Sequence, residues 1–259
     1  MFNKEIIKAI LENVGDDLKR VYKKVGLCKI KPKDIPKELN LEEIEFKHEA
    51  YKNEEGDVYI GEFRKNTTIR EGRGILISRE GFIYEGFWID DRRFGFGRIL
   101  IPNGNVYQGQ WVNDQSSGKG VYSTVEGLTY KGEWKANKCH GHGYELYKDG
   151  SWFEGKFKDG EKNGKGHFKW ADGKEYKGSF KNGSMDGYGE ISWPDGRSYK
   201  GDWVCDYKEG KGTFTWSDGK SYTGEWKNGR QHGIGKYTSA NGETKEGEWD
   251  KGNRIRWIE

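Results

Sequence analysis

Proline, cysteine and long apolar runs are all scarce in this chain of 259 residues. Only four prolines accompany forty glycines, so we expect glycine to supply the turns. Three cysteines, Cys28, Cys139 and Cys205, are odd in number and widely spaced, which argues against a disulfide framework and for a reducing, cytoplasmic setting. No run of 18 apolar residues occurs, so no membrane-spanning helix is predicted. Residues 1–5 lead into an amphipathic segment rather than a signal peptide.

A charge of one sign is lacking as well. The net charge is only +3, from 45 basic and 42 acidic residues that are interspersed. A nucleic-acid-binding protein concentrates basic charge on one face, so we expect no nucleic-acid partner. Hydrophobic residues make up 32% of the chain and charged residues 34%, a balance that favours disorder when aromatic residues are few.

Aromatic residues are abundant, however. With 11 Trp, 15 Tyr and 12 Phe beside the 40 glycines, we expect large rings to provide the burial in a thin, mostly β structure. The rings recur as aromatic-x-Gly-x-aromatic, and from Tyr84 onward the step is 23 residues every time. A constant short period indicates a repeat array. The copies begin at Tyr59, Tyr84, Tyr107, Tyr130, Phe153, Tyr176, Tyr199 and Tyr222, with a degraded ninth at Lys245.

One repeat, residues 174–196, predicts a β-hairpin. Large or small residues alternate with polar ones from Glu175 to Phe180, the period of a strand with one buried face. Asn182-Gly183 then suits a two-residue hairpin turn, because both residues accept a positive φ. A second strand follows over residues 187–193, and Pro194-Asp195-Gly196 turns the chain into the next repeat.

Glycine positions also recur in every repeat. A Gly, Asn or Asp stands three residues after each second aromatic, and a Gly stands three residues before each first aromatic, which predicts positive φ at both places. A Gly-x-Gly pair opens the second strand of every repeat except the ninth, as at Gly187 and Gly189. We expect each pair to bend the strand and to lie under a ring of its neighbour. The rings would then form ladders that hold the hairpins in register, and a ligand cage is the alternative interpretation.

This pattern resembles the MORN (membrane occupation and recognition nexus) repeat. Tyr130-Lys-Gly132-Glu-Trp134 and Tyr222-Thr-Gly224-Glu-Trp226 are similar to its motif, and the resemblance covers residues 51–259, about nine repeats with the last one degenerate or capping. It implies a mainly β fold: an elongated, twisted, single-layer antiparallel sheet of consecutive hairpins. Such repeats occur in cytoskeletal and ciliary scaffolds, in membrane tethers and as accessory regions of lipid kinases, whose catalysis lies in another domain.

Residues 1–50 carry no repeat. Apolar residues spaced four and three apart predict an amphipathic α-helix, followed by a linker and a first strand. Two interpretations remain open: a helix folded back to cover a sheet edge, or a helix that docks to a partner or forms a dimer. The seam consists of Ile7, Leu11, Val14, Leu18, Val21 and Val25.

The sequence shows no catalytic constellation, so we expect no enzyme and no cofactor. Its Gly-x-Gly pairs lack the strand-to-helix context of a dinucleotide site. Cys139, His140 and His142 have no second ligand pair at zinc spacing, so no metal site is predicted.

One aromatic cluster departs from uniformity: Trp170, Trp193 and Trp216 occupy one position in three successive repeats, beside Phe168 and Phe214. Either they thicken the packing, or they form a strip for a partner.

The leading hypothesis is a non-catalytic scaffold that presents its sheet to protein partners, in a cytoskeletal or ciliary (axonemal, radial-spoke-like) assembly. The cilium rests on the family resemblance alone. The alternative is a peripheral membrane or phosphoinositide-binding module, or an accessory subunit of a lipid kinase. Acidic neighbours such as Glu133 and Asp202 interrupt the basic residues, so only weak contact with anionic lipid is expected.

Overall fold

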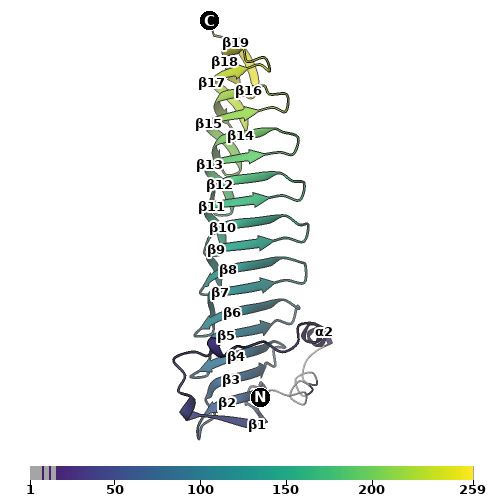
Figure 1. Cartoon of the computed structure of the whole chain (residues 1–259), viewed down its shortest axis with the longest axis vertical. Helices are drawn as coiled ribbons and strands as arrows, with labels where there is room; N and C mark the ends of the chain where they lie inside the picture. Colours follow the sequence, from purple (N-terminus) through teal and green to yellow (C-terminus); the bar gives the residue numbers. More distant parts are fainter. Residues whose placement is uncertain (1–7, 9–11, 13–15, 259) are drawn as a thin grey trace. The chain divides into compact units, whose positions relative to one another are not determined.

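The computed structural model describes residues 8, 12 and 16–258. The chain is mainly β (Figure 1). It divides into two compact units, Met1–Lys138 and Cys139–Glu259, called unit 1 and unit 2 below. In each unit, consecutive strands pair with antiparallel neighbours and make an open sheet of hairpins. In the described part of the chain, one leading strand is followed by nine hairpins, in agreement with the predicted fold class.

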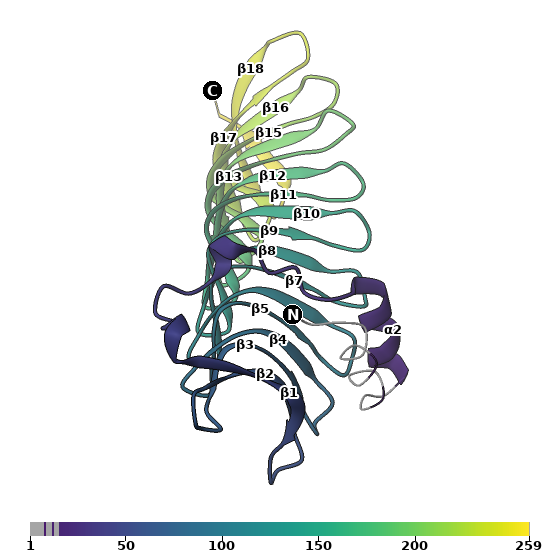
Figure 2. The same ribbon diagram turned by 60° about the horizontal axis from the view of Figure 1, so that its bottom comes forward.

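Ahead of its strands, the described part of unit 1 contains the α-helix α2, Asp16–Val25, and two short 3-10 helices, η1 (Pro32–Asp34) and η2 (Leu41–Glu43). Figure 2 shows its strands bending along their length. The strands are β1 Ile44–Lys52, β2 Val58–Arg64, β3 Arg70–Ile77, β4 Ile83–Ile89, β5 Arg92–Leu100, β6 Val106–Val112, β7 Gln115–Ser123 and β8 Thr129–Lys135.

Unit 2 consists of strands and turns only in its described residues. Its strands are β9 Lys138–Leu146, β10 Trp152–Lys158, β11 Glu161–Lys169, β12 Glu175–Lys181, β13 Ser184–Ser192, β14 Ser198–Val204, β15 Tyr207–Thr215, β16 Ser221–Lys227, β17 Arg230–Thr238, β18 Thr244–Asp250 and β19 Asn253–Trp257.

The predicted turn geometry is confirmed. Asn182 and Gly183 have φ of 49° and 85°, so both central residues of the β12–β13 turn are left-handed. The position three residues after the second aromatic has positive φ in every repeat, from Asn66 to Gly252. The glycine three residues before the first aromatic has positive φ as well, from Gly56 to Gly242.

The Gly-x-Gly pair marks a bulge in seven of the hairpins. Gly178 on β12 lies opposite Gly189 on β13, whereas Phe180 lies opposite Met185, so β13 holds extra residues between these two pairs. Gly187 lies within the bulge with a φ of 93°. This is the bend that the glycine pair predicted. The second glycine joins a row of glycines that face one another across successive strands, as do Gly178, Gly189 and Gly201.

A tyrosine ring covers the glycine row in most repeats. A Cβ added to Gly189 would lie 2.2 Å from the Tyr176 Oη, so only glycine leaves room for the ring. The Tyr176 hydroxyl donates a hydrogen bond of 3.0 Å to the backbone carbonyl of Ser179, which satisfies the buried polar group. Tyr59, Tyr84, Tyr107, Tyr130, Tyr199 and Tyr222 donate in the same way.

The predicted aromatic ladder is confirmed too. Tyr176 packs edge-to-face against Phe180 of its own repeat, at 5.2 Å between ring centroids, and against Trp203 of the next repeat, at 5.5 Å. The Trp203 Nε1 also donates to the carbonyl of Gly189 at 3.2 Å. Each ring therefore joins two hairpins, which explains how a single layer of β-structure obtains a core.

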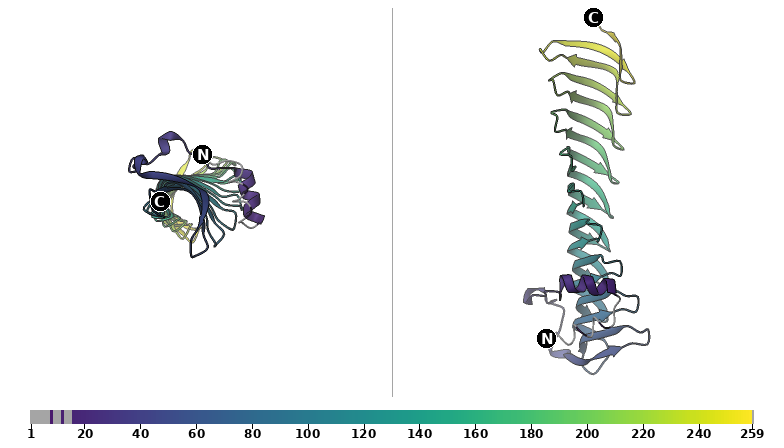
Figure 3. Two further views of the ribbon diagram at one scale, coloured as in Figure 1. Left: turned by 90° about the horizontal axis from the view of Figure 1, so that it is seen from below. Right: turned by 90° about the vertical axis from the view of Figure 1, so that its right-hand side faces the viewer.

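The described part of the N-terminal segment lies on the first repeats. Tyr22 on α2 is buried against Ile75, Ile77, Ile83 and Leu100, which project from β3, β4 and β5. The segment thus crosses a face of the sheet and not an edge, because the apolar residues that it covers alternate with the ring positions along each strand (Figure 3, right). Of the predicted seam, Ile7, Leu11 and Val14 lie outside the described residues; Leu18, Val21 and Val25 belong to α2.

Candidate partner-binding surface

Two faces of the sheet have to be distinguished. We call the face with the tyrosines, the glycine row and the second aromatics the ring face, and the other one the opposite face. In unit 1, the opposite face is occupied by the chain's own N-terminal segment. The Tyr22 hydroxyl donates to Glu85 Oε1 at 2.7 Å, and the backbone N–H of Cys28 donates to Glu85 Oε2 at 3.1 Å. This part of the sheet is therefore closed to a partner.

A buried ion pair completes this contact. Arg98 bonds both Glu85 and the backbone carbonyl of Gly26, and the side chains of Arg98 and Glu85 are only 4% and 3% exposed. Burial raises the pKa of Tyr22 and raises that of the Cys28 thiol to about 11, so both groups stay protonated at neutral pH. The Glu85 charge is thereby matched by three donors from two parts of unit 1.

The tryptophans singled out in the sequence lie on unit 2, at strand ends next to the Asp-Gly turns. All three are half-buried, and no ring contact joins two of them directly within the described residues. The contacts run through other rings instead. Trp193 packs on Phe214 at 6.0 Å and Trp216 packs on Phe214 at 4.9 Å, while Trp170 packs on Phe168 at 4.4 Å. We call Trp193, Phe214, Trp216 and Tyr237 the ring row, since Tyr237 follows Trp216 at 6.2 Å.

Cations lie near the start of several second strands, opposite the second aromatic. In unit 1, the Arg70 guanidinium lies 4.2 Å from the Trp88 ring centroid, and Arg93 lies 4.7 Å from that of Trp111. Each arginine bonds an aspartate of the following turn: Arg70 Nε to Asp91 Oδ1 at 3.0 Å, and Arg93 Nε to Asp114 Oδ1 at 2.9 Å. These cations are neutralised within the sheet.

Unit 2 has lysines at this position. The Lys162 Nζ lies 2.8 Å from Glu145 Oε2 and donates to the Tyr147 hydroxyl at 2.8 Å. Lys208 lies among four rings, with its Nζ 4.7 Å from the centroid of Phe214 and 4.9 Å from that of Trp226. The ring centroids of Tyr199 and Trp193 lie 5.2 Å and 5.8 Å from the same Nζ. Burial, aided by the charge of Arg197, lowers the pKa of Lys208 to about 8.

Sequence reasoning missed Lys208. The signal was the position itself, at which Arg, Lys, Met, Gln and small residues stand in different repeats, opposite an invariantly aromatic partner. Only the strand pairing shows that this position faces the rings: Lys208 lies opposite Trp203, as Met185 lies opposite Phe180.

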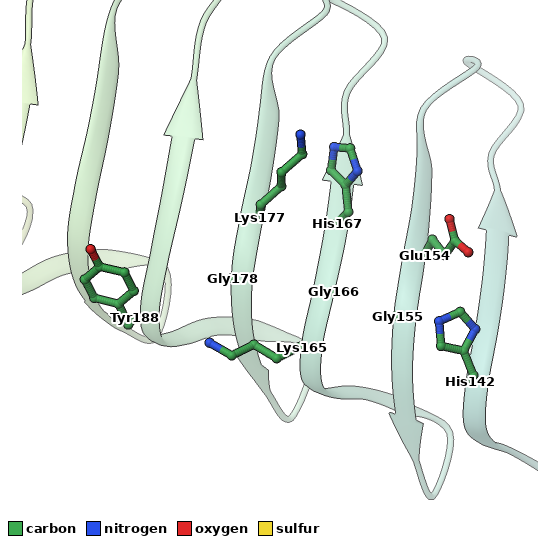
Figure 4. A pocket seen from close by; sticks show the side chains of 9 residues that line it. All are labelled: His142, Glu154, Gly155, Lys165, Gly166, His167, Lys177, Gly178 and Tyr188. Carbon is green, nitrogen blue, oxygen red and sulfur yellow. The ribbon is translucent and has the colours of Figure 1, made fainter.

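The opposite face of unit 2 is polar and open. A shallow cavity of about 510 Å³ lies there, shown in Figure 4 with Lys177 and His167 side by side. His167 Nε2 is 3.1 Å from Glu175 Oε2, and hydrogen bonds from Lys169 and His167 lower the pKa of Glu175. The side chains that line the cavity are those of His142, Glu154, Lys165, His167, Lys177 and Tyr188.

Metal ligation finds no support in these positions: within the described residues, no group of three or more His, Cys, Asp or Glu side chains is placed to hold an ion. Nor is any helix in the described part of the chain long and apolar enough to span a membrane.

A comparison with protein-family models decides the family. The MORN repeat model matches seven consecutive segments, which together make up more than half of the chain. This chain belongs to the MORN repeat family. The matched segments are residues 84–106, 107–129, 130–152, 153–175, 176–196, 199–221 and 222–244.

The structure adds a hairpin at each end of these seven MORN repeats. β2 and β3 form the first, and β18 and β19 form the last, in which the usual tyrosine is Lys245 and Trp249 packs against Trp257 at 6.1 Å. The nine repeats expected from the sequence thus correspond to nine hairpins among the described residues.

Two of the solved structures matched by this MORN array have low sequence identity and TM-scores below 0.5. The TCP10 domain of Danio rerio CPAP is 10% identical with a TM-score of 0.45, and the match covers 81% of this chain and 99% of that one. The Drosophila melanogaster SAS-4 TCP domain, solved with a proline-rich motif of Ana2, is 10% identical with a TM-score of 0.37, over 78% and 99%. A search of curated proteins gave no match.

Proposed function

We propose that this MORN-repeat protein is a non-catalytic scaffold that holds protein partners against its sheet. The observation that carries the proposal is the ring row of unit 2. Trp193 and Trp216 are half-buried large rings at strand ends, and in the described residues no segment of the chain lies over them as the N-terminal segment lies over unit 1. Partly exposed aromatic clusters are typical of protein interfaces, where Trp and Tyr supply much of the binding energy.

The test compares partner capture with stability. The full chain and a Trp193→Ala/Trp216→Ala variant are used to capture proteins from a cytoskeletal and ciliary extract, with Val204→Ala, an exposed aliphatic change, as the control. We expect the double variant to lose the captured proteins while its melting temperature falls by no more than about 4 °C, the shift for about 1 kcal/mol in a chain of this size. Equal capture by all three proteins would contradict the proposal.

Within this proposal, we place the scaffold in the cytoplasm, in a cytoskeletal or ciliary assembly. We also propose the seam from Ile7 to Val25 as a docking or dimerising element of residues 1–50. Light scattering tests the dimer: a monomeric full chain, or a dimer unaffected by Leu11→Glu, would remove it.

A second candidate function is contact with an anionic membrane or a phosphoinositide, directly or as an accessory subunit of a lipid kinase. The cavity on the opposite face of unit 2 favours it, because Lys165 and Lys177 both line it. Glu154 in the same cavity reduces the positive potential, and stable attachment needs clustered basic charge. Flotation with phosphoinositide-containing vesicles at low salt tests it, and no association would remove it.

A further inference from the structure

Lys208 differs from Arg70, Arg93 and Lys162 in having no counter-ion, and from Arg254, which is exposed at the same position of the last hairpin, in being half-buried among rings. For Arg70, the partner is Asp91 in the following turn, whose backbone N–H also donates to the Arg70 carbonyl at 3.1 Å. The same backbone bond joins Gly229 to Lys208 at 2.9 Å, but glycine brings no carboxylate. The turn geometry is thus retained while the negative charge is lost.

Lys208 also lacks a carboxylate of the kind that pairs with Lys162. Lys162 is paired with Glu145, which stands 17 residues earlier in the chain. The residue 17 positions before Lys208 is Ile191, which is buried and apolar. Among the described residues, no carboxylate oxygen lies within 4.0 Å of the Lys208 Nζ. The four rings around the Nζ stabilise a cation, but they cannot accept the strong hydrogen bonds that an ammonium group makes.

The ring row continues from this cation. Trp193 and Phe214 contact Lys208, and Trp216 and Tyr237 extend the row along the strand ends. Arg197 is the second cation near Lys208, with its guanidinium 5.4 Å from the Trp193 ring centroid. Its Nε already donates to Asp195 Oδ2 at 2.7 Å. The end of the ring row at Trp193 and Phe214 therefore offers apolar area and an enclosed positive charge that no carboxylate among the described residues matches.

We propose that Lys208 and the ring row bind an extended acidic segment of a partner protein, with one Asp or Glu carboxylate on the Lys208 Nζ and apolar neighbours on Trp193 and Trp216. This inference rests on the proposed scaffold function and names the chemistry of its partner. A carboxylate would supply the counter-ion that Asp91 and Glu145 supply elsewhere, in a charge-assisted hydrogen bond shielded by rings. A membrane fits less well, because anionic lipid requires clustered basic residues, whereas Lys208 is a single enclosed cation whose neighbour Arg197 is already paired with Asp195.

A lowered pKa agrees with an unpaired ammonium group. Burial among rings without a counter-ion lowers the pKa of Lys208 to about 8, so the group is still mostly charged at neutral pH and can bind an anion.

The experiment pans a random 12-residue peptide library on the full chain and on Lys208→Met. Methionine occupies this position one repeat earlier, at Met185, so the variant is expected to fold. Lys227→Met, at an exposed lysine, serves as the matched control. We expect peptides with Asp or Glu next to an aromatic or aliphatic residue, and fluorescence anisotropy should show at least a tenfold weaker Kd for Lys208→Met and no change for Lys227→Met.

A double-mutant cycle locates the carboxylate. Replacing the peptide's acidic residue by its amide should weaken binding to the unmodified chain tenfold and have no effect on binding to Lys208→Met. A charge swap, Lys208→Glu with Lys in the peptide, should recover binding.

Three outcomes would overturn the inference. Selected peptides without acidic residues that bind Lys208→Met equally would refute the carboxylate assignment while leaving the scaffold function intact, which the extract capture tests separately. A library that yields no binder refutes the peptide site. Sedimentation with phosphatidylserine vesicles that depends on Lys208, without peptide binding, would assign the site to lipid instead.

Discussion

The two units are built from the same repeat but use its two faces differently. Glu85 and Arg98 face each other on the opposite face of unit 1, and their counterparts 92 residues later are Lys177 and Glu190 on unit 2. The first pair is buried under the N-terminal segment, whereas Lys177 and Glu190 are exposed. The repeat motif therefore specifies the hairpin and the ring ladder, while the positions between the motif residues decide whether a face is covered or open.

The ring face shows a similar contrast. Unit 1 neutralises Arg70 and Arg93 with an aspartate in the next turn, and unit 2 has glycine at that turn position beside Lys162 and Lys208. Aspartate and glycine both accept the left-handed conformation that the turn needs, so the fold does not discriminate between them. Charge pairing at this position can thus change without any cost to the hairpin, which leaves it free to serve binding.

The largest effect should come from the covered face of unit 1. Glu85→Gln removes the charge that Arg98, Tyr22 and the Cys28 amide share, and breaking a buried ion pair from one side typically costs about 3–5 kcal/mol. We expect a loss of this size in the free energy of unfolding, measured by urea denaturation.

The matched change on unit 2 is Glu190→Gln. Its partner Lys200 is 4.0 Å away and both side chains are exposed, so we expect a change below about 0.5 kcal/mol. Equal losses of unfolding free energy in the two units would contradict this comparison, because burial under the N-terminal segment would then have no effect on stability.

The next largest effect concerns what both units share, the glycine row. A Cβ at Gly189 would overlap the Tyr176 ring, so Gly189→Ala should destabilise unit 2 by about 2–3 kcal/mol through overpacking. The control is Gly219→Ala, where φ is +86° but no atom lies within 4 Å, so only backbone strain of about 1 kcal/mol is expected. Thermal unfolding measures both. A smaller loss for Gly189→Ala than for Gly219→Ala would refute the steric role of the row.

Much of this architecture was predictable from the sequence because the motif repeats with constant spacing. The positive φ at Gly173 and the ring of Tyr176 over Gly189 follow from residue types that have few alternatives. The cover over unit 1 did not follow, because the partner of Glu85 is separated from it by 63 residues at Tyr22 and no local pattern links them. Lys208 was missed for a related reason: a lysine in a strand is ordinarily solvated, and only strand pairing places it among four rings.

The smallest effect, and the sharpest test of the ring face, compares two lysines. Lys162→Met leaves Glu145, which is 15% exposed, without its cation, so it should lower the melting temperature. Lys208→Met removes a cation that burial disfavours, so at pH 7 it should raise the melting temperature by a few degrees, about 1 kcal/mol or less. If the two substitutions change the melting temperature in opposite directions, the presence of a counter-ion, and not the surrounding rings, determines whether the lysine stabilises the fold.

The difference in stability between Lys208→Met and the unmodified chain should also depend on pH. The pKa of Lys208 is lowered to about 8 in the folded chain, so from about pH 8 upward the folded state binds fewer protons than the unfolded state and this group's contribution to stability increases with pH. The advantage of Lys208→Met over the unmodified chain should therefore shrink between pH 7 and pH 9.5, below the range in which the buried tyrosines Tyr176 and Tyr199, with raised pKa values, lose protons. A constant advantage over this range would mean that Lys208 titrates like a solvated lysine, and its enclosure by Trp193, Phe214 and Trp226 would then have no effect on its charge.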